Sequence, residues 1–192
     1  MRASGRAGFT LVEVLVSLTM LSIVLGAAVA VMLGVQRGYI RQRETARAET
    51  ALRTAETTVV SVLRTAGADP YNTGLTLLDP DAKNRGVFDN VRVVSDFNPA
   101  DGDVKDLLED VLVYVERDTL YVSWKQGEPA TPVAAPVRLL RFEYYPSTGP
   151  PLTTRAQILG ATRVKVLLAA PRHSRTTALA RRESWVYLRN RR

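Results

Sequence analysis

The sequence predicts an α+β fold in which one long N-terminal helix packs on an antiparallel β-sheet. Residues 9–66 contain no proline and are rich in strong helix formers, first apolar and then mixed with charges. After Pro70 come short runs rich in Val, Leu, Tyr and Phe, separated by turn residues and not by further helices. Strands that follow one helix without alternating helices favour an antiparallel sheet with the helix on one face.

The N-terminal stretch combines a basic leader with an apolar run that contains one acid. Residues 1–8 hold two arginines and no carboxylate, and the run that follows extends from Phe9 to Val35. That length is enough to cross a bilayer, which takes about 20 residues. Glu13 is the one charged residue in the run, and a charge at membrane depth costs roughly 2.5–3.5 kcal/mol. A carboxylate retained at that cost indicates a binding partner, and therefore assembly.

Helix is predicted to continue through residues 37–66, the amphipathic half. Apolar residues recur there at spacings of three and four, which gives one stripe that needs a surface to cover: Leu52, Ala55, Val59, Leu63 and Ala66. Arg53, Glu56 and Arg64 fall on the opposite face. Gly67 is a candidate C-cap, and Asp69-Pro70 ends the run.

The remaining residues, 67–192, are predicted to form a β-rich head. The strand-like runs are residues 87–94, 111–116, 119–124, 137–145, 162–170 and 184–188. A short connection, residues 116–119, predicts a hairpin over 111–124. Residues 71–86, 126–136 and 146–154 have the composition of loops, and residues 172–182 that of a basic hairpin loop or a poorly ordered segment.

The charge of the head is unevenly spread along the chain. The net charge of the whole chain is +7. Residues 66–162 hold nine basic and fourteen acidic residues, whereas residues 163–192 hold nine basic residues and one acid. A basic terminal segment can attract nucleic acid, anionic lipid or an acidic neighbour, or it can simply be a solvated edge.

The residues give little support to catalysis. The one histidine, His173, has no serine or carboxylate arrangement near it in the sequence that would form a nucleophile pair. No glycine-rich phosphate loop precedes a helix, and there is no Cys or His cluster with zinc spacing. The chain also has no cysteine, so no disulfide supports the head. We therefore expect a protein that is not an enzyme and needs no organic cofactor.

One acidic loop is a candidate calcium site. Calcium takes six to eight oxygen ligands, and clustered Asp and Asn side chains around a glycine turn can supply them. The candidate ligands are Asp96, Asn98, Asp101 and Asp103. The pattern departs from the spacing of an EF-hand loop, and the same residues are also what ordinary solvent-exposed turns contain. Both interpretations stay open from the sequence.

A nucleic-acid surface is the second candidate. Arginines near the C-terminus could contact phosphates: Arg181, Arg182, Arg189, Arg191 and Arg192. Aromatic residues are interleaved with them, although the sequence favours core or sheet positions for Tyr144, Tyr145, Trp124 and Trp185. No recognised nucleic-acid fold accompanies these residues.

The stretch Gly8-Phe9-Thr10-Leu11-Val12-Glu13 resembles the processing site of type IV pilins and type II secretion pseudopilins. The resemblance covers residues 8 to about 35. It implies that a prepilin peptidase cuts after Gly8, that Phe9 is then methylated, and that Glu13 is the assembly carboxylate. Two features depart from many major pilins, namely the lack of cysteine and Ala30 at a position where they carry a proline. A looser resemblance over residues 91–171 points to PilW-type minor pilins and GspJ-type pseudopilins.

The resemblance also implies how the chain is divided, where it is located and which partners it has. It divides the chain into a leader, residues 1–8, a transmembrane or filament-core helix, 9–36, an amphipathic helix, 37–66, and a pilin head, 67–192. The expected location is the inner membrane, single-pass with a cytoplasmic N-terminus, and then the periplasm or cell exterior in a pilus. Expected partners are the peptidase, an inner-membrane assembly platform, and other minor and major pilins in a filament or tip complex.

Four alternatives remain beside a minor pilin. Within assembly, a type II secretion pseudopilin fits the same residues. An ordinary signal peptide cut after Ala30 is disfavoured, because Glu13 lies where the apolar region should begin and the run exceeds the usual length. A plain membrane anchor explains the length but not Glu13. The fourth alternative is a surface-exposed binding module for DNA or a host surface, carried on the same helix, which the basic terminal segment keeps open.

Overall fold

The computed structural model describes residues 10–70, 78–86, 88–97, 100–172 and 178–188, and the chain divides into two units, residues 1–43 and 44–192. The first element, α1, spans Leu11–Thr65 and so contributes residues to both units. The long helix expected from the sequence is confirmed, and it ends one residue before the predicted Ala66.

In the first unit every described residue is exposed. The polar hydroxyls of this apolar stretch are satisfied within the helix itself. Ser17 donates to the backbone oxygen of Glu13, Thr19 to that of Val16 and Ser22 to that of Leu18, each at 2.8 Å. A helix whose hydroxyls bond to its own carbonyls brings no unpaired donor into an apolar environment.

In the second unit the C-terminal part of α1 covers the β-structure with its predicted apolar stripe. The stripe residues Leu52, Ala55, Val59, Leu63 and Ala66 are all at most 1 % exposed. After the helix, Gly67 adopts φ of +75°, the left-handed conformation that favours glycine just past a helix end. The stripe and the C-cap predicted from the sequence are therefore confirmed.

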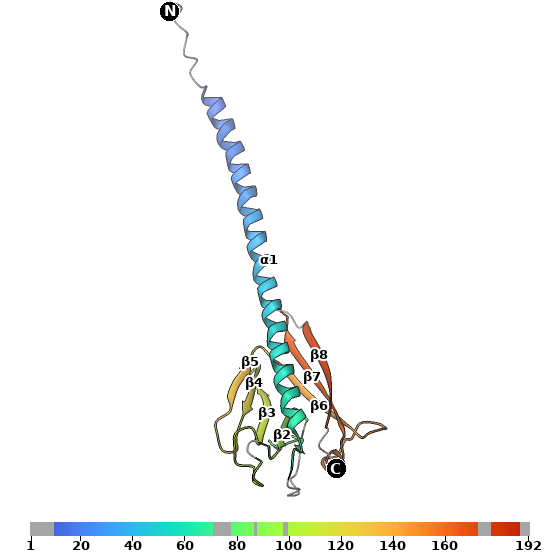
Figure 1. Cartoon of the computed structure of the whole chain (residues 1–192). Helices are drawn as coiled ribbons and strands as arrows, with labels where there is room; N and C mark the ends of the chain where they lie inside the picture. Colours follow the sequence, from blue (N-terminus) through green and yellow to red (C-terminus); the bar gives the residue numbers. More distant parts are fainter. Residues whose placement is uncertain (1–9, 71–77, 87, 98–99, 173–177, 189–192) are drawn as a thin grey trace, which may run out of the picture. The chain divides into compact units, whose positions relative to one another are not determined.

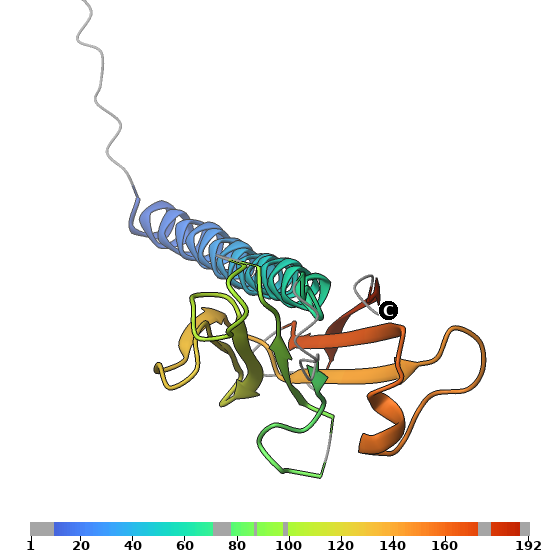
Figure 2. The same cartoon turned by 60° about the horizontal axis from the view of Figure 1, so that its bottom comes forward.

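The strands form two antiparallel sheets (Figure 1). The first has the order β1-β2-β3-β4-β5, with bounds Leu78–Asp79, Asn90–Val94, Asp110–Glu116, Thr119–Ser123 and Thr131–Ala134. The second has the order β6-β7-β8, with bounds Leu139–Tyr145, Arg163–Pro171 and Leu179–Tyr187. A short helix, α2, spans Arg155–Ile158. Within the second unit, both sheets lie on the same side of α1 (Figure 2).

The predicted hairpin is a two-residue turn between β3 and β4. Glu116 pairs with Thr119, and the intervening Arg117 and Asp118 have φ of +48° and +57°. Two positive φ values identify a type I′ turn, whose twist matches that of the flanking strands. Asp118 tolerates this conformation because its short polar side chain is less strained there than most residues.

The two sheets meet where β6 approaches the start of β2. The N–H of Phe142 donates to the oxygen of Phe88 at 2.8 Å, and the Phe88 ring lies edge-on to that of Tyr144 with centroids 5.8 Å apart. Buried residues of α1 and of both sheets form one continuous core. The head is thus a single packed unit built from two sheets.

Several predicted details are wrong. The sequence predicted one sheet, and the structure has two. β5 lies inside the predicted loop 126–136, since an edge strand can contain a proline, here Pro132. β8 begins at Leu179, inside the segment predicted as a basic loop. Its inward positions include Arg182 and Ser184, which bond to Glu56 of α1, so β8 lacks the alternating apolar pattern that marks a strand.

Candidate functional sites

The first turn of α1 is organised by Thr10. The N–H of Glu13 contacts both the backbone oxygen and the side-chain hydroxyl of Thr10, at 3.1 and 3.3 Å, and the N–H of Val14 donates to the same backbone oxygen at 3.2 Å. Thr10 is therefore the N-cap and Glu13 occupies the third helical position. Thr-x-x-Glu is the capping-box pattern, a signal that was readable in the sequence but was not used in the prediction.

This geometry places the Glu13 carboxylate in the first turn, at the positive end of the helix dipole, and its side chain is exposed. The other two residues of the predicted processing site, Gly8 and Phe9, lie outside the described residues. The cut itself therefore remains a prediction.

The apolar part of α1 has no partner within this chain among the described residues. Its large side chains between Leu11 and Val35 are roughly half to three-quarters exposed. By length and composition α1 is the one described helix that could cross a membrane, and the apolar window that qualifies is not buried in the fold. Such a surface requires lipid or other subunits to cover it.

The acidic loop between β2 and β3 is built on two buried carboxylates. Asp96 accepts hydrogen bonds from the N–H groups of Asp101 and Gly102, at 3.1 and 3.0 Å. Glu109 accepts from the N–H groups of Phe97 and Asp106, at 3.1 and 3.2 Å. Both acids are fully buried. Their oxygens bind the backbone of the described parts of the loop, as in N-caps and turns, and so tie these parts together.

The outer acids of the loop lie close together. Carboxylate oxygens of Asp101, Asp103 and Asp106 are all within 4.8 Å of one another. Asp103 also accepts from the N–H of Lys105 at 2.8 Å and from its ammonium at 3.1 Å, and these bonds lower the pKa of the Asp103 carboxyl. Of the predicted calcium ligands, Asp101 and Asp103 are thus brought together and Asp96 faces the loop backbone. Asn98 lies outside the described residues. Calcium binding here remains a prediction.

The predicted nucleic-acid arginines do not share one environment. Arg181 is exposed on β8, whereas Arg182 points to α1 and pairs with the carboxylate of Glu56. Arg189, Arg191 and Arg192 lie outside the described residues, as does His173. The aromatic residues also divide: Tyr144 is fully buried, and Trp185 is 48 % exposed.

The contact between Glu56 and β8 was missed at the level of sequence. Ser184 and Arg182 both donate to the Glu56 carboxylate. Partial burial acts to raise the pKa of Glu56, but the hydrogen bonds from Ser184 and Arg182 outweigh it and lower that pKa below its usual value. Glu56 is 126 and 128 positions before Arg182 and Ser184, so no local pattern could reveal the contact.

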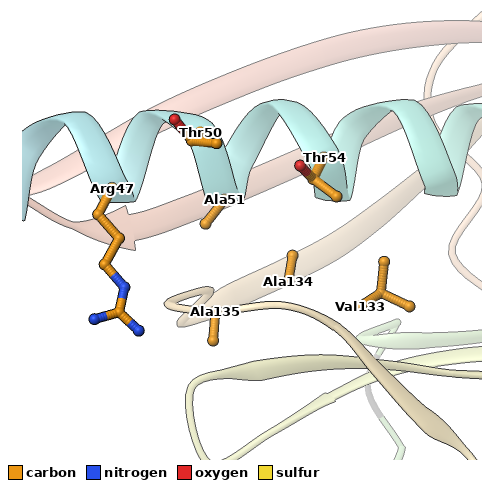
Figure 3. Close-up of a pocket in the computed structure, with 7 residues that line it drawn as sticks. All are labelled: Arg47, Thr50, Ala51, Thr54, Val133, Ala134 and Ala135. Atoms are coloured by element: carbon orange, nitrogen blue, oxygen red, sulfur yellow. The ribbon is translucent and has the colours of Figure 1, made fainter.

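A groove of about 320 Å³ lies between α1 and the chain around the end of β5 (Figure 3). Arg47 is the one charged residue in the lining of this groove. The lining residues are Arg47, Thr50, Ala51, Thr54, Val133, Ala134 and Ala135. In the close-up the Arg47 side chain extends from the helix toward Ala135. These residues offer no acid–base pair and no nucleophile with an adjacent base, so the groove lacks the chemistry of an active site.

Residues 3–29 match the family model described as the prokaryotic N-terminal methylation motif. The match contains Gly8, Phe9, Thr10 and Glu13, and it ends within the apolar part of α1. A comparison with curated proteins finds no match to the chain. The chain therefore carries a prepilin-type motif of the kind found in type IV pilins and pseudopilins. Its fold, a long N-terminal helix whose second half covers antiparallel sheets, is consistent with that class.

Proposed function

We propose that this chain is a minor pilin of a type IV pilus. It is cut between Gly8 and Phe9, methylated on Phe9, and incorporated in the filament as part of the priming or tip complex. The observation that carries the proposal is the methylation motif at residues 3–29, which extends into a helix whose apolar side chains have no cover within the described chain.

The physical basis of assembly is the transfer of this helix from lipid to a bundle of like helices. Exposed apolar side chains from Leu11 onward are covered by lipid before assembly and by neighbouring helices afterwards. The hydroxyls of Ser17, Thr19 and Ser22 are satisfied within the helix, so they oppose neither state. The same surface can therefore serve both environments.

Glu13 supplies direction to this association. Once the chain is cut, the ammonium of Phe9 is a positive charge at the end of the helix. In a bundle, the Glu13 carboxylate of one subunit meets that ammonium on its neighbour, which reduces the cost of burying either charge. Thr10 contributes by starting the helix, and so it sets Glu13 in the first turn.

The place in a terminal complex is supported by what the chain lacks relative to many major pilins. It has no cysteine, so no disulfide closes a C-terminal loop, and Ala30 replaces the helix proline. A terminal subunit repeats few times in a filament, so its sequence is under fewer constraints from identical neighbours.

The mass and N-terminal residue of the protein recovered from sheared filaments test this proposal. We expect residues 1–8 to be absent and a methyl group on Phe9. Recovery of a chain that begins after Ala30 would overturn the proposal, because that product lacks the apolar helix. Recovery in filaments of a chain with an intact leader would overturn it as well.

A type II secretion pseudopilin is the alternative, because the same motif occurs in both systems. The proteins that co-purify with the processed chain distinguish the two. Pilus subunits support the minor-pilin role, and secretion-system subunits support the pseudopilin role.

A further inference from the structure

The three-stranded sheet β6-β7-β8 has one face that is turned away from α1 and carries several exposed side chains. On β8, Arg182 and Ser184 bond to Glu56 of α1, so the even-numbered residues face the helix. Side chains alternate along a strand, and β6, β7 and β8 pair even with even and odd with odd. The odd-numbered residues of these three strands therefore lie on the opposite side, here called the outer face.

The outer face carries aromatic rings in an exposed setting. Trp185 and Tyr187 are 48 % and 63 % exposed, and they are neighbours on the same side of β8. Tyr145, across the sheet on β6, has its ring centroid 5.0 Å from that of Trp185 at an angle of 53°. Large exposed rings grouped on one face indicate an interaction surface.

Cations lie among these rings, together with the carboxylate of Glu143, which accepts a hydrogen bond from the Tyr145 hydroxyl at 3.1 Å. In register, Arg163 stands between Tyr145 and Tyr187, and its guanidinium is 5.8 Å from the centre of the Trp185 ring. Arg163 donates two hydrogen bonds to the backbone oxygen of Pro146, which orient it without neutralising its charge. The face thus presents an oriented positive charge within cation–π distance of an aromatic ring.

Three of the four cations on the outer face keep their charge available. Lys165 pairs with Glu183 at 2.9 Å. Within the described ranges, no carboxylate partner is recorded for Arg141, Arg163 or Arg181. From Arg181 to Tyr187 the strand extends about 20 Å, so charge and rings are spread along the length of β8.

We propose that the outer face of β6-β7-β8 binds single-stranded nucleic acid. This ligand has both features that the face answers: planar bases that stack on aromatic rings, and phosphates that pair with arginines. A neutral polysaccharide would use the rings and leave the cations unpaired. A duplex would use the cations but keeps its base faces stacked inside. Binding here is independent of the role of the helix in assembly.

The surface proposed here differs from the nucleic-acid surface predicted from the sequence. Of the arginines singled out in the sequence, Arg181 lies on the outer face, whereas Arg182 faces α1 and is neutralised by Glu56. Arg163 was not part of that prediction, and the sequence favoured core or sheet positions for Tyr145 and Trp185. Register, not closeness in sequence, brings them together.

Fluorescence anisotropy of a labelled oligothymidylate of about twelve nucleotides, titrated with the full chain in a neutral detergent, tests the proposal. Trp185→Leu keeps an apolar side chain but removes the ring, and it should weaken binding by about 5- to 150-fold. Trp185→Phe keeps a ring and should retain most of the affinity. Each of Arg141→Ser and Arg181→Ser should lower the slope of log affinity against log salt by about 0.7.

Arg117→Asn is the matched control, because it removes one exposed arginine from the β3–β4 turn and asparagine accepts the positive φ there. It should leave binding unchanged. An unchanged melting temperature for each variant ensures that affinity is compared between folded proteins. The proposal is overturned if the oligonucleotide does not bind, if Trp185→Leu binds as well as wild type, or if polyphosphate or duplex competes equally at equal charge.

Discussion

The carboxylate of Glu56, in α1, accepts a hydrogen bond from the guanidinium of Arg182, in β8, 126 residues later in the chain. This contact joins the helix to the edge strand of the three-stranded sheet. Ser184 donates to the same carboxylate. The side chains of Glu56 and Arg182 are 23 % and 37 % exposed, so the burial of this ion pair is intermediate between that of a surface pair and that of a buried pair.

Replacing Glu56 by glutamine should destabilise the head by about 1–2 kcal/mol at neutral pH, because the Arg182 guanidinium loses its counter-charge in a partly dry site. The pKa of Glu56 is lowered on folding. Its contribution is therefore fully present above the unfolded pKa, near 4.5, and is lost as the pH falls through the lower folded value. Chemical denaturation of wild type and Glu56→Gln across pH 3–7 measures this, and the two curves should converge at the acid end.

Asp118→Asn provides a comparison for that experiment. Asp118 pairs with Arg138 at 2.9 Å, but both side chains are about half exposed. Solvent screens such a pair, so the substitution should cost less than about 0.5 kcal/mol. Equal losses for Asp118→Asn and Glu56→Gln would show that the helix–sheet contact has no special weight.

The acids of the loop between β2 and β3 have two different roles: some hold the loop backbone, and others are candidate calcium ligands. Asp96→Ala removes the acceptor for two backbone N–H groups in a buried site, and it should lower stability by roughly 1–3 kcal/mol even in the presence of a chelator. Asp101→Ala should leave the stability measured in the presence of a chelator almost unchanged. Thermal unfolding of both variants measures the difference.

Calcium should raise the melting temperature of wild type if the loop binds it. A ligand at a hundredfold excess over its Kd adds about 2.7 kcal/mol to the folded state. We expect this response in wild type and its loss in Asp101→Ala. Identical melting temperatures in millimolar calcium and in chelator would exclude a calcium site at Asp101 and Asp103.

A fragment of residues 37–192 should fold without the apolar segment. The buried part of α1 begins near Ala48, and the core it forms with both sheets contains no residue of the apolar stretch. We expect a soluble fragment with one cooperative thermal transition. A broad transition, together with strong binding of a dye that reports exposed apolar surface, would mean that the head depends on its neighbours.

The parts of the fold that were predictable are those specified by local pattern. The spacing of Leu52, Ala55, Val59 and Leu63 predicted the buried side of α1, and the short link at residues 116–119 predicted the hairpin. Val164, Val166 and Leu168 alternate with charged or less buried neighbours, and this pattern predicted the strand β7 that contains them.

What was missed depends on contacts between distant segments. β8 has Arg182 and Ser184 on its inner side, and only the position of Glu56 makes those residues suitable there. The division into two sheets depends on the approach of Phe142 to Phe88, which no spacing encodes. The candidate processing site, in contrast, is a continuous motif and was readable in full. Thr10 was overlooked as the N-cap of α1, although the Thr-x-x-Glu pattern indicates an N-cap.

The assembly role of Glu13 can be tested without disturbing the start of the helix. Glutamine also serves at the third position of a capping box, so Glu13→Gln keeps the cap at Thr10 and removes only the charge. Thr10→Ala is the complementary variant, since it removes the capping hydroxyl and keeps the charge. If the charge is what matters, Thr10→Ala should assemble and Glu13→Gln should not.

Co-purification of Glu13→Gln with its partner pilins is the measurement that tests the account most directly. We expect normal insertion and normal cleavage, but a loss of filament entry, because a buried ammonium without its partner costs roughly 3–5 kcal/mol. That cost corresponds to a reduction of at least about a hundredfold in an assembly equilibrium. Recovery of Glu13→Gln in the filament complex at the wild-type level would contradict the assembly role of this carboxylate.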